Sequence, residues 1–237
     1  MIDWHSHILP AMDDGSRSVA EGLSLVAALS DQGVDTVVAT PHFYANDEGV
    51  QQFLSRRKQC FDLLREQLTP DGPRILLGAE VRYYPGIGRL ADLKGLCIEG
   101  SNLLLLEMPF ERWTEYTVRE VIELAGSGGV TVVLAHIERY LRLQSGDVWQ
   151  RLIDGGVLMQ VNAGFFCGPL SRRRALRLLT RGGIHLIGSD CHNMTSRPPR
   201  LGKAFMIIEK KLGGHFASQM HEYGQSLLVQ NNSKIFN

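Results

Sequence analysis

Seven short apolar or β-branched stretches recur along the chain, separated by longer segments with helical periodicity. This alternation predicts a parallel sheet whose strands are joined by right-handed helical crossovers. Because the repetition is regular, we expect an α/β fold in which the sheet closes into a barrel. The expected strands are Ile2–His7, Thr36–His42, Arg74–Glu80, Leu103–Glu107, Val130–His136, Val157–Asn162 and Ile184–Asp190.

The intervening segments place apolar residues at helical spacing. In residues 50–68, Phe53, Phe61 and Leu64 share one side of the predicted helix, and Arg56 and Lys58 lie on the other. After the last strand we expect a loop, a helix and, from residue 213 onward, only one or two further helical turns. The expected helices are residues 19–30, 50–68, 115–124, 148–153, 171–180 and 201–212.

Six of the seven expected strands end on a side chain that commonly binds metal ions. In a barrel of parallel strands the C-terminal ends converge on one face, where enzymes of this architecture place their active sites. A single histidine there could be an ordinary buried imidazole, but a set of five histidines and four carboxylates at one edge favours a metal site. The set is His5, His7, Asp14, His42, Glu80, Glu107, His136, Asp190 and His192.

The chemistry of this set restricts the metal ions. His5 and His7 are two residues apart, so a β-strand directs both imidazoles to one point in space. Imidazole and carboxylate ligands without thiolates suit Zn, Fe, Mn, Co or Mg. Because so many ligands exceed the need of one ion, we expect two or three ions a few Å apart, as in enzymes that hydrolyse phosphate esters.

Composition argues against several other kinds of protein. The 237 residues, 44% of them hydrophobic, can bury a substantial core, and we expect one domain over residues 1–237. The formal net charge is +0 at pH 7, so neither nucleic acid nor an anionic membrane is an expected partner. The four cysteines form no C-x-x-C pair, and no apolar run reaches the roughly 18 residues of a membrane span. We therefore expect a cytoplasmic protein without a signal peptide.

Several motifs, in matching order, resemble those of the polymerase-and-histidinol-phosphatase (PHP) superfamily. The resemblance is strongest to the bacterial protein tyrosine phosphatases of capsular and exopolysaccharide loci, and it extends from residue 1 to about residue 199. The motifs are His5-Ser6-His7, Asp13-Asp14-Gly15, Thr40-Pro41-His42, Gly78-Ala79-Glu80, Ala135-His136-Ile137-Glu138-Arg139-Tyr140 and Ser189-Asp190-Cys191-His192-Asn193.

The resemblance implies a distorted (β/α)7 barrel of the PHP type with three metal ions. Other PHP members often have histidine where this chain has Asp14 and Glu107, so its ligand set is richer in oxygen. That difference favours Mn, with Fe, Mg, Co or Zn as alternatives. By motif, one ion would be held by His5, His7, Glu80 and Asp190, a second by Glu80, Glu107 and His136, and a third by Asp14, His42 and His192.

By the same resemblance, the reaction would be hydrolysis of phosphotyrosine on a protein by a metal-bridging hydroxide. Arg139 and Arg197 follow the fifth and seventh strands, where each guanidinium could bind the phosphate through two hydrogen bonds. The resemblance also implies a partner, namely a bacterial tyrosine autokinase with a Tyr-rich tail that regulates capsule or exopolysaccharide biosynthesis.

Other readings remain open at this point. Cys191-x5-Arg197 matches the spacing of cysteine-dependent tyrosine phosphatases, but the segment has no glycine and ends in two prolines, which suits a phosphate-binding loop poorly. A histidinol-phosphate phosphatase of the same superfamily would share the metals and differ in its pocket. An amidohydrolase-type hydrolase, a polymerase-associated exonuclease and a non-catalytic scaffold with a vestigial metal site are less favoured.

Overall fold

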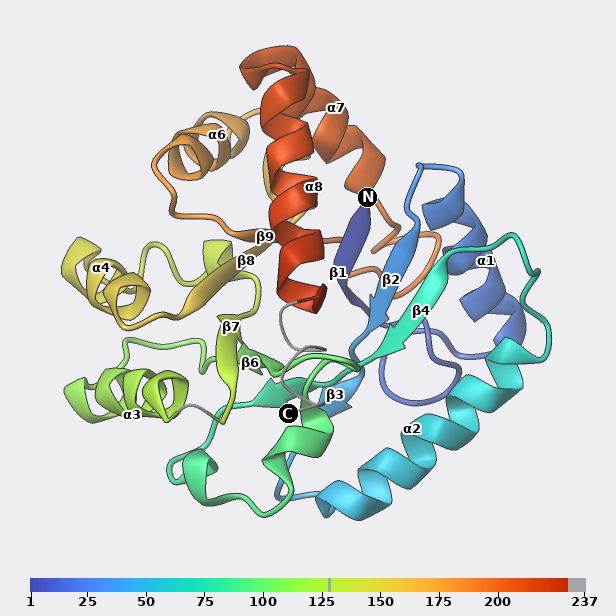
Figure 1. The fold of residues 1–237 in the computed structure, drawn as a ribbon, viewed down its shortest axis with the longest axis horizontal. Coiled ribbons are helices and arrows are strands. Elements are labelled where there is room, and N and C mark those ends of the chain that lie inside the picture. The colour runs from blue at the N-terminus through green and yellow to red at the C-terminus, as the bar shows by residue number, and fades with distance from the viewer. Residues whose placement is uncertain (128, 230–237) are drawn as a thin grey trace.

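The computed structural model describes residues 1–127 and 129–229. In this part of the chain, parallel strands form a curled inner ring, and helices form an outer layer around it (Figure 1). The strands are β1 (Ile2–Ser6), β2 (Thr36–Ala39), β3 (His42–Phe43), β4 (Arg74–Leu77), β5 (Glu80–Arg82), β6 (Leu103–Glu107), β7 (Thr131–Leu134), β8 (Leu158–Asn162) and β9 (Leu186–Gly188). The α-helices are α1 (Val19–Ser30), α2 (Val50–Arg65), α3 (Glu115–Gly126), α4 (Gly146–Asp154), α5 (Gly164–Cys167), α6 (Arg172–Thr180), α7 (Leu201–Leu212) and α8 (Gly214–Val229).

The strands pair in two sheets, in the orders β1-β2-β4 and β3-β5-β6-β7-β8-β9. Strand β1 is linked to the segment that follows β9. There the Asp190 backbone N–H donates to the His5 carbonyl at 2.7 Å. The His7 N–H donates to the Cys191 carbonyl at 2.9 Å. These bonds close the ring between the two sheets, so the expected distorted α/β barrel is confirmed.

Two of the expected strands are each interrupted, which corrects their prediction as continuous elements. The second strand breaks between β2 and β3 at Thr40 and Pro41, and the third breaks between β4 and β5 at Gly78 and Ala79. Pro41 has no N–H with which to continue the ladder. A Cβ on Gly78 would lie 3.3 Å from the Thr40 side chain, so the two interrupted segments pack closely against each other at this position. The barrel is distorted at this point.

The expected helices form, although several of their ends differ. The bounds of α1 and α7 are those expected, whereas α2 ends at Arg65, three residues early. The short helix α5 and three 3-10 turns (Ile87–Arg89, Leu93–Leu96 and Ile137–Arg139) were not expected. Helix α8 corrects the expectation of one or two turns, because it runs for 16 residues to Val229. The expectation for residues 230–237 lies outside the described residues.

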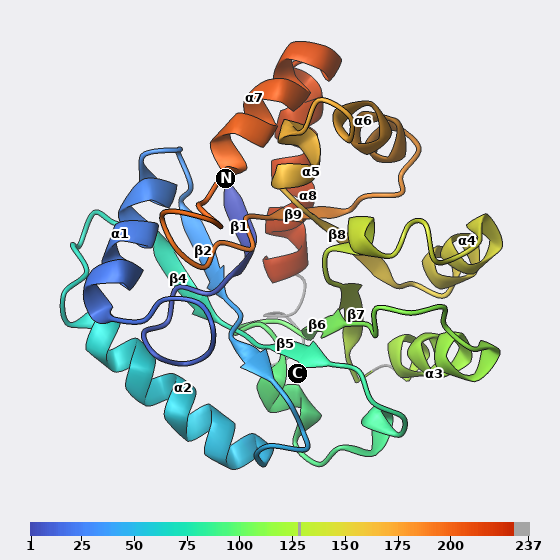
Figure 2. The same ribbon diagram turned by 180° about the vertical axis from the view of Figure 1, so that it is seen from behind.

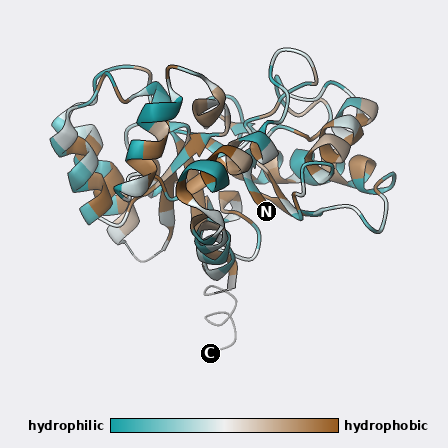
Figure 3. Ribbon diagram, turned by 90° about the horizontal axis from the view of Figure 1, so that it is seen from above, coloured by the Kyte–Doolittle hydropathy of each residue, from teal (hydrophilic) through white to brown (hydrophobic). Residues whose placement is uncertain are grey.

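Apolar side chains fill both surfaces of the strand ring. Val37 belongs to the large core between strands and helices, and the adjacent Val38 belongs to a smaller cluster with Trp4 inside the ring. Helix α8 passes in front of the ring in Figure 1 and behind it in Figure 2, and a Cβ on its Gly224 would lie 3.1 Å from Trp4. Viewed from above, the strands are mostly hydrophobic (Figure 3). Among the described helices, none has both the length and the hydrophobicity of a membrane span.

Candidate metal centre

The structure brings the nine expected ligands together at one face of the ring. Most of them lie at or just beyond the C-terminal ends of strands, as the parallel arrangement requires. His42 and Glu80 instead open β3 and β5, the short strands that follow the two breaks. The interruptions therefore turn these two side chains toward the same centre. Asp14 reaches the centre from the loop after β1.

Glu80 lies at the middle of the cluster and is almost completely buried. Its Oε2 is 3.1 Å from His5 Nε2, 3.3 Å from His7 Nε2 and 3.1 Å from His42 Nδ1. Its Oε1 is 2.7 Å from His136 Nε2. Burial alone would raise the pKa of Glu80, but His5 and the other imidazoles outweigh it and hold that pKa well below its usual range. Glu80 is thus an anionic group that faces four imidazoles.

The remaining expected ligands surround this group at longer distances. Asp190 Oδ1 is 3.7 Å from His5 Nε2 and 3.6 Å from His7 Nε2. Glu107 Oε1 is 3.6 Å from His136 Nε2. In three groups of these side chains the candidate ligand atoms lie within 4.8 Å of one another, a spacing that could hold a metal ion. The groups are His5, His7 and Asp190; His42, Glu80 and Glu107; and His7, Asp14, His42 and His192.

Asp14, His42 and His192 form the outer part of the centre. Asp14 Oδ1 is 3.4 Å from His42 Nε2 and 3.3 Å from His192 Nε2, and the Asp14 side chain is 65% exposed. Among the described residues, neither His42 Nδ1 nor His192 Nε2 makes a hydrogen bond, although both atoms are buried and a carboxylate oxygen lies 3.1 Å from the first and 3.3 Å from the second. Burial and the nearby His7 lower the pKa of His192 to about 4, which keeps its imidazole neutral near pH 7. Neutral imidazole is the form that binds metal ions.

Asp13 lies beside the centre and contacts two of the expected ligands, although the sequence pattern indicated no role for it. Its Oδ2 accepts from His7 Nδ1 at 2.7 Å and from the His42 backbone N–H at 2.9 Å, and its Oδ1 accepts from the Gly15 N–H at 2.9 Å. Such a carboxylate fixes the orientation of a metal-binding histidine and raises its basicity. The signal was present in the sequence, because Asp13 directly precedes the expected ligand Asp14.

Strand β8 also contributes to the centre. It corresponds to the sixth expected strand, the one that ended without a metal-binding side chain. Asn162 Nδ2 donates to Asp190 Oδ2 at 2.6 Å. Two residues earlier on the same strand, Gln160 Oε1 accepts from the His136 N–H at 2.6 Å and lies 3.4 Å from His5 Nδ1. The available signal was that Asn162 ends β8 and Gln160 lies two residues before it, since the C-terminal ends of parallel strands meet at this face.

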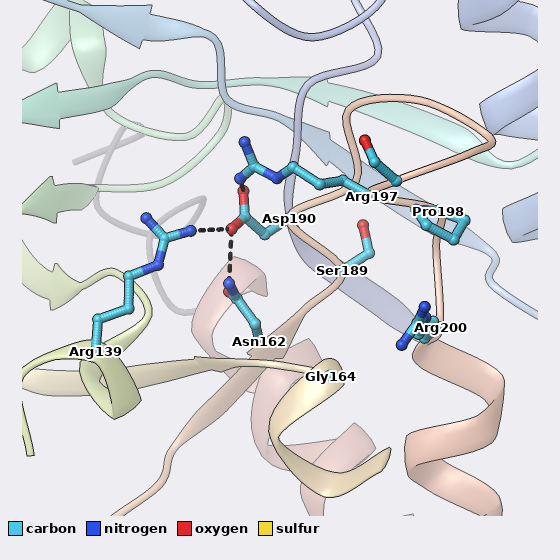
Figure 4. Close-up of a pocket in the computed structure, with 9 residues that line it drawn as sticks. Arg139, Asn162, Gly164, Ser189, Asp190, Arg197, Pro198 and Arg200 are labelled. Carbon is cyan, nitrogen blue, oxygen red and sulfur yellow. Dashed lines mark hydrogen bonds and ion pairs between the residues drawn. The ribbon is translucent and has the colours of Figure 1, made fainter. Parts of the chain in front are cut away.

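Arg139 and Arg197 lie where the sequence suggested, on either side of Asp190 (Figure 4). Arg139 Nη2 donates to Asp190 Oδ2 and Arg197 Nη2 donates to Asp190 Oδ1, both at 2.8 Å. Each side chain is more than one third exposed, so each guanidinium also faces the solvent above the centre. An anion that approached this side of the cluster would meet two cations.

The structure argues against the cysteine mechanism. Cys191 is completely buried, and burial raises the pKa of its thiol, so the reactive thiolate is disfavoured. A phosphate-binding loop also needs free backbone N–H groups. Here the N–H groups of Thr195, Ser196 and Arg197 all donate to the Asn193 side-chain oxygen, at 3.1, 2.8 and 3.2 Å. These three N–H groups are therefore already hydrogen-bonded within the loop and are not free to bind a phosphate.

The chain is similar to known proteins over most of its length. The model of the family described as capsular polysaccharide synthesis, CpsB/CapC, matches residues 1–237. The tyrosine-protein phosphatase YwqE of Bacillus subtilis is 30% identical, with 100% of this chain and 94% of the relative covered. The tyrosine-protein phosphatase CpsB of Streptococcus pneumoniae is 33% identical, with 93% of this chain and 94% of the relative covered.

Solved structures show the same likeness. A crystal structure from work on YwqE of Bacillus subtilis and CpsB of Streptococcus pneumoniae, described as unique metal-dependent tyrosine phosphatases, has a TM-score of 0.82 and 28% identity. The match covers 96% of this chain and 94% of that one. Histidinol phosphate phosphatase from Lactococcus lactis, complexed with Zn, L-histidinol and phosphate, has a TM-score of 0.55 and 14% identity, with 88% and 92% covered. The second likeness extends to the fold alone.

Proposed function

Because the chain belongs to the CpsB/CapC family of capsular polysaccharide synthesis, we propose that it is a metal-dependent protein tyrosine phosphatase. It is a phosphoric monoester hydrolase that removes phosphate from phosphotyrosine on a protein. The observation that carries the proposal is the group of imidazoles and carboxylates around the buried Glu80. The full-length similarity to curated tyrosine-protein phosphatases supports the choice of substrate class.

The chemistry of the cluster fits a metal centre. Its donors are imidazole nitrogens and carboxylate oxygens, and within residues 1–127 and 129–229 two of the buried imidazole nitrogens have no hydrogen-bond partner. We propose three ions, with Mn as the first choice because the set is rich in carboxylates. When bound, they would lower the pKa of a water molecule that attacks phosphorus and would offset negative charge on the phosphoryl oxygens. The proposed ligands are His5, His7, Glu80 and Asp190 for one ion, Glu80, Glu107 and His136 for the second, and Asp14, His42 and His192 for the third.

The protein itself contributes orientation and charge. Asp13 and Asn162 hold His7 and Asp190 in place. Arg139 and Arg197 supply donors beside the cluster, and we propose that they bind the phosphoryl oxygens as negative charge develops on them. The leaving phenol has a pKa near 10, so departure of the phenolate places little demand on a general acid.

The natural substrate would be a tyrosine kinase that autophosphorylates a Tyr-rich tail and regulates capsule or exopolysaccharide biosynthesis. Membership of a capsular polysaccharide synthesis family supports this partner. We propose a cytoplasmic enzyme. All four cysteines are unpaired, as is usual in a reducing compartment.

The decisive assay compares phosphate release from a phosphotyrosine peptide and from histidinol phosphate, with Mn present and after chelation. We expect strong preference for the peptide and loss of activity on chelation, with recovery when Mn is restored. Preference for histidinol phosphate would instead place the chain in amino-acid metabolism. Activity that resists chelation would refute metal dependence.

A further inference from the structure

A cavity of about 210 Å³ opens on the side of Asp190 that faces β8 and the start of α7. That volume is many times the roughly 10–15 Å³ that is needed, by the same measure, to hold one water molecule. Asp190 is the only one of the nine proposed metal ligands among the residues that line it. The lining comprises Arg139, Asn162, Gly164, Ser189, Asp190, Ser196, Arg197, Pro198 and Arg200. The cavity is therefore adjacent to the metal centre without coinciding with it.

The charges on this lining are unequal, with three guanidinium groups against one carboxylate. Arg139 and Arg197 both pair with Asp190, and each also lies near a second carboxylate. Arg139 Nη1 is 4.0 Å from Glu107 Oε1, and Arg197 Nη1 is 3.7 Å from Asp14 Oδ2. Arg200 forms no ion pair within 4.0 Å in the part of the chain that the structure describes. Figure 4 shows Arg200 on the opposite side of the cavity from Arg139. Arg200 is the unbalanced cation of the cavity.

The backbone that carries Arg200 is firmly attached to the barrel. Gln32, just beyond α1, donates from Nε2 to the Pro199 carbonyl at 3.1 Å and accepts at Oε1 from the Gly202 N–H at 2.9 Å. A Cβ on Gly202 would lie 2.9 Å from the Gln32 side chain, so the two segments are in close contact. Arg200 thus projects from a fixed point, which reduces the entropy cost of binding an anion.

We propose that this cavity is a second anion subsite of the phosphatase, in which Arg200 binds an acidic group carried by a residue next to the reacting phosphotyrosine. The proposal rests on the proposed function. The group is a carboxylate or a second phosphate on the same peptide, because a guanidinium binds either through paired hydrogen bonds. Arg200 is a specificity residue, since within the described residues its side chain makes no hydrogen bond or ion pair with the metal ligands that would carry the reaction.

The test uses three phosphotyrosine peptides that differ only beside the reacting residue, where they carry glutamine, glutamate or a second phosphotyrosine. The full-length enzyme is assayed with Mn, as wild type, as Arg200→Gln and as Arg177→Gln. Arg177 is an exposed cation on α6 that does not line the cavity, so it controls for the general positive charge of the surface.

We expect wild type to show a KM about 5-fold lower for an acidic peptide than for the neutral one, close to the limit for one solvent-accessible ion pair. Arg200→Gln should remove this preference while kcat for the neutral peptide stays unchanged, and 0.5 M salt should reduce the preference in wild type. Arg177→Gln should retain it. Preference for the doubly phosphorylated peptide alone identifies the anion as phosphate, whereas preference for both acidic peptides identifies a general anion subsite.

Equal KM values for the three peptides in wild type would overturn the subsite and leave the phosphatase function standing. Equal losses in Arg200→Gln and Arg177→Gln would overturn it as well, because the effect would then belong to the whole basic surface. Failure to hydrolyse any of the three peptides would refute the phosphatase function, and the subsite with it.

Discussion

Asp13 should control how tightly the metal centre binds its ions, although it is not a proposed ligand. Asp13→Ala removes the acceptor for His7 Nδ1 and for two backbone N–H groups. The His7 imidazole then loses the bond that orients its Nε2 toward Glu80. Loss of such a supporting partner typically weakens metal affinity about 10- to 100-fold, or about 1.4 to 2.7 kcal/mol. The Asp13 side chain is 6% exposed, so each stranded N–H should also cost about 1 to 3 kcal/mol of folding stability.

The assay is titration of the metal-free enzyme with Mn by calorimetry, with circular dichroism to verify the fold. Asp13→Asn should give an intermediate affinity, because one amide oxygen can still accept from His7 but no longer carries charge. Asp71→Ala, in an exposed turn before β4, is the matched control and should leave affinity unchanged. A folded Asp13→Ala protein that binds Mn within about twofold of wild type would refute the orienting role.

Three further substitutions test the centre and the residues beside it. Glu80→Gln removes the charge that faces four imidazoles, and phosphate release from a phosphotyrosine peptide should fall to background while circular dichroism shows a folded barrel; substantial residual turnover would exclude Glu80 as a bridge. Arg197→Ala should lower kcat about 10- to 1000-fold, the usual effect of losing one preorganised donor to a developing anion. An unchanged kcat would mean that Arg197 only pairs with Asp190 and does not bind the phosphoryl group. Cys191→Ser should retain most of the activity in the same assay, because the thiol is buried; a complete loss in a folded variant would revive the cysteine mechanism.

The convergence of the nine candidate side chains on one face could be predicted from the sequence, whereas the interruption of two strands could not. Strand ends meet at one face in any parallel barrel, so the convergence of the proposed ligands required only the order of the strands. The breaks at Pro41 and Gly78 depend on how two adjacent segments pack together, which apolar periodicity does not record. Asp13 and Asn162 have side chains that are common in loops, and only their three-dimensional contacts reveal that they hold His7 and Asp190.

Closure of the barrel and assembly of the metal centre both depend on the backbone at His136 and Asp190. His136 and Asp190 have φ values of 32° and 52°, a left-handed conformation that costs a non-glycine residue of order 1 to 3 kcal/mol. The His136 N–H is held by Gln160 at 2.6 Å, and the Asp190 N–H makes the 2.7 Å bond to His5 that closes the ring. The turned backbone therefore directs both side chains toward the centre at a cost that barrel closure helps to offset. Ions that bind only the folded cluster should stabilise the barrel further, because they favour the folded state by mass action.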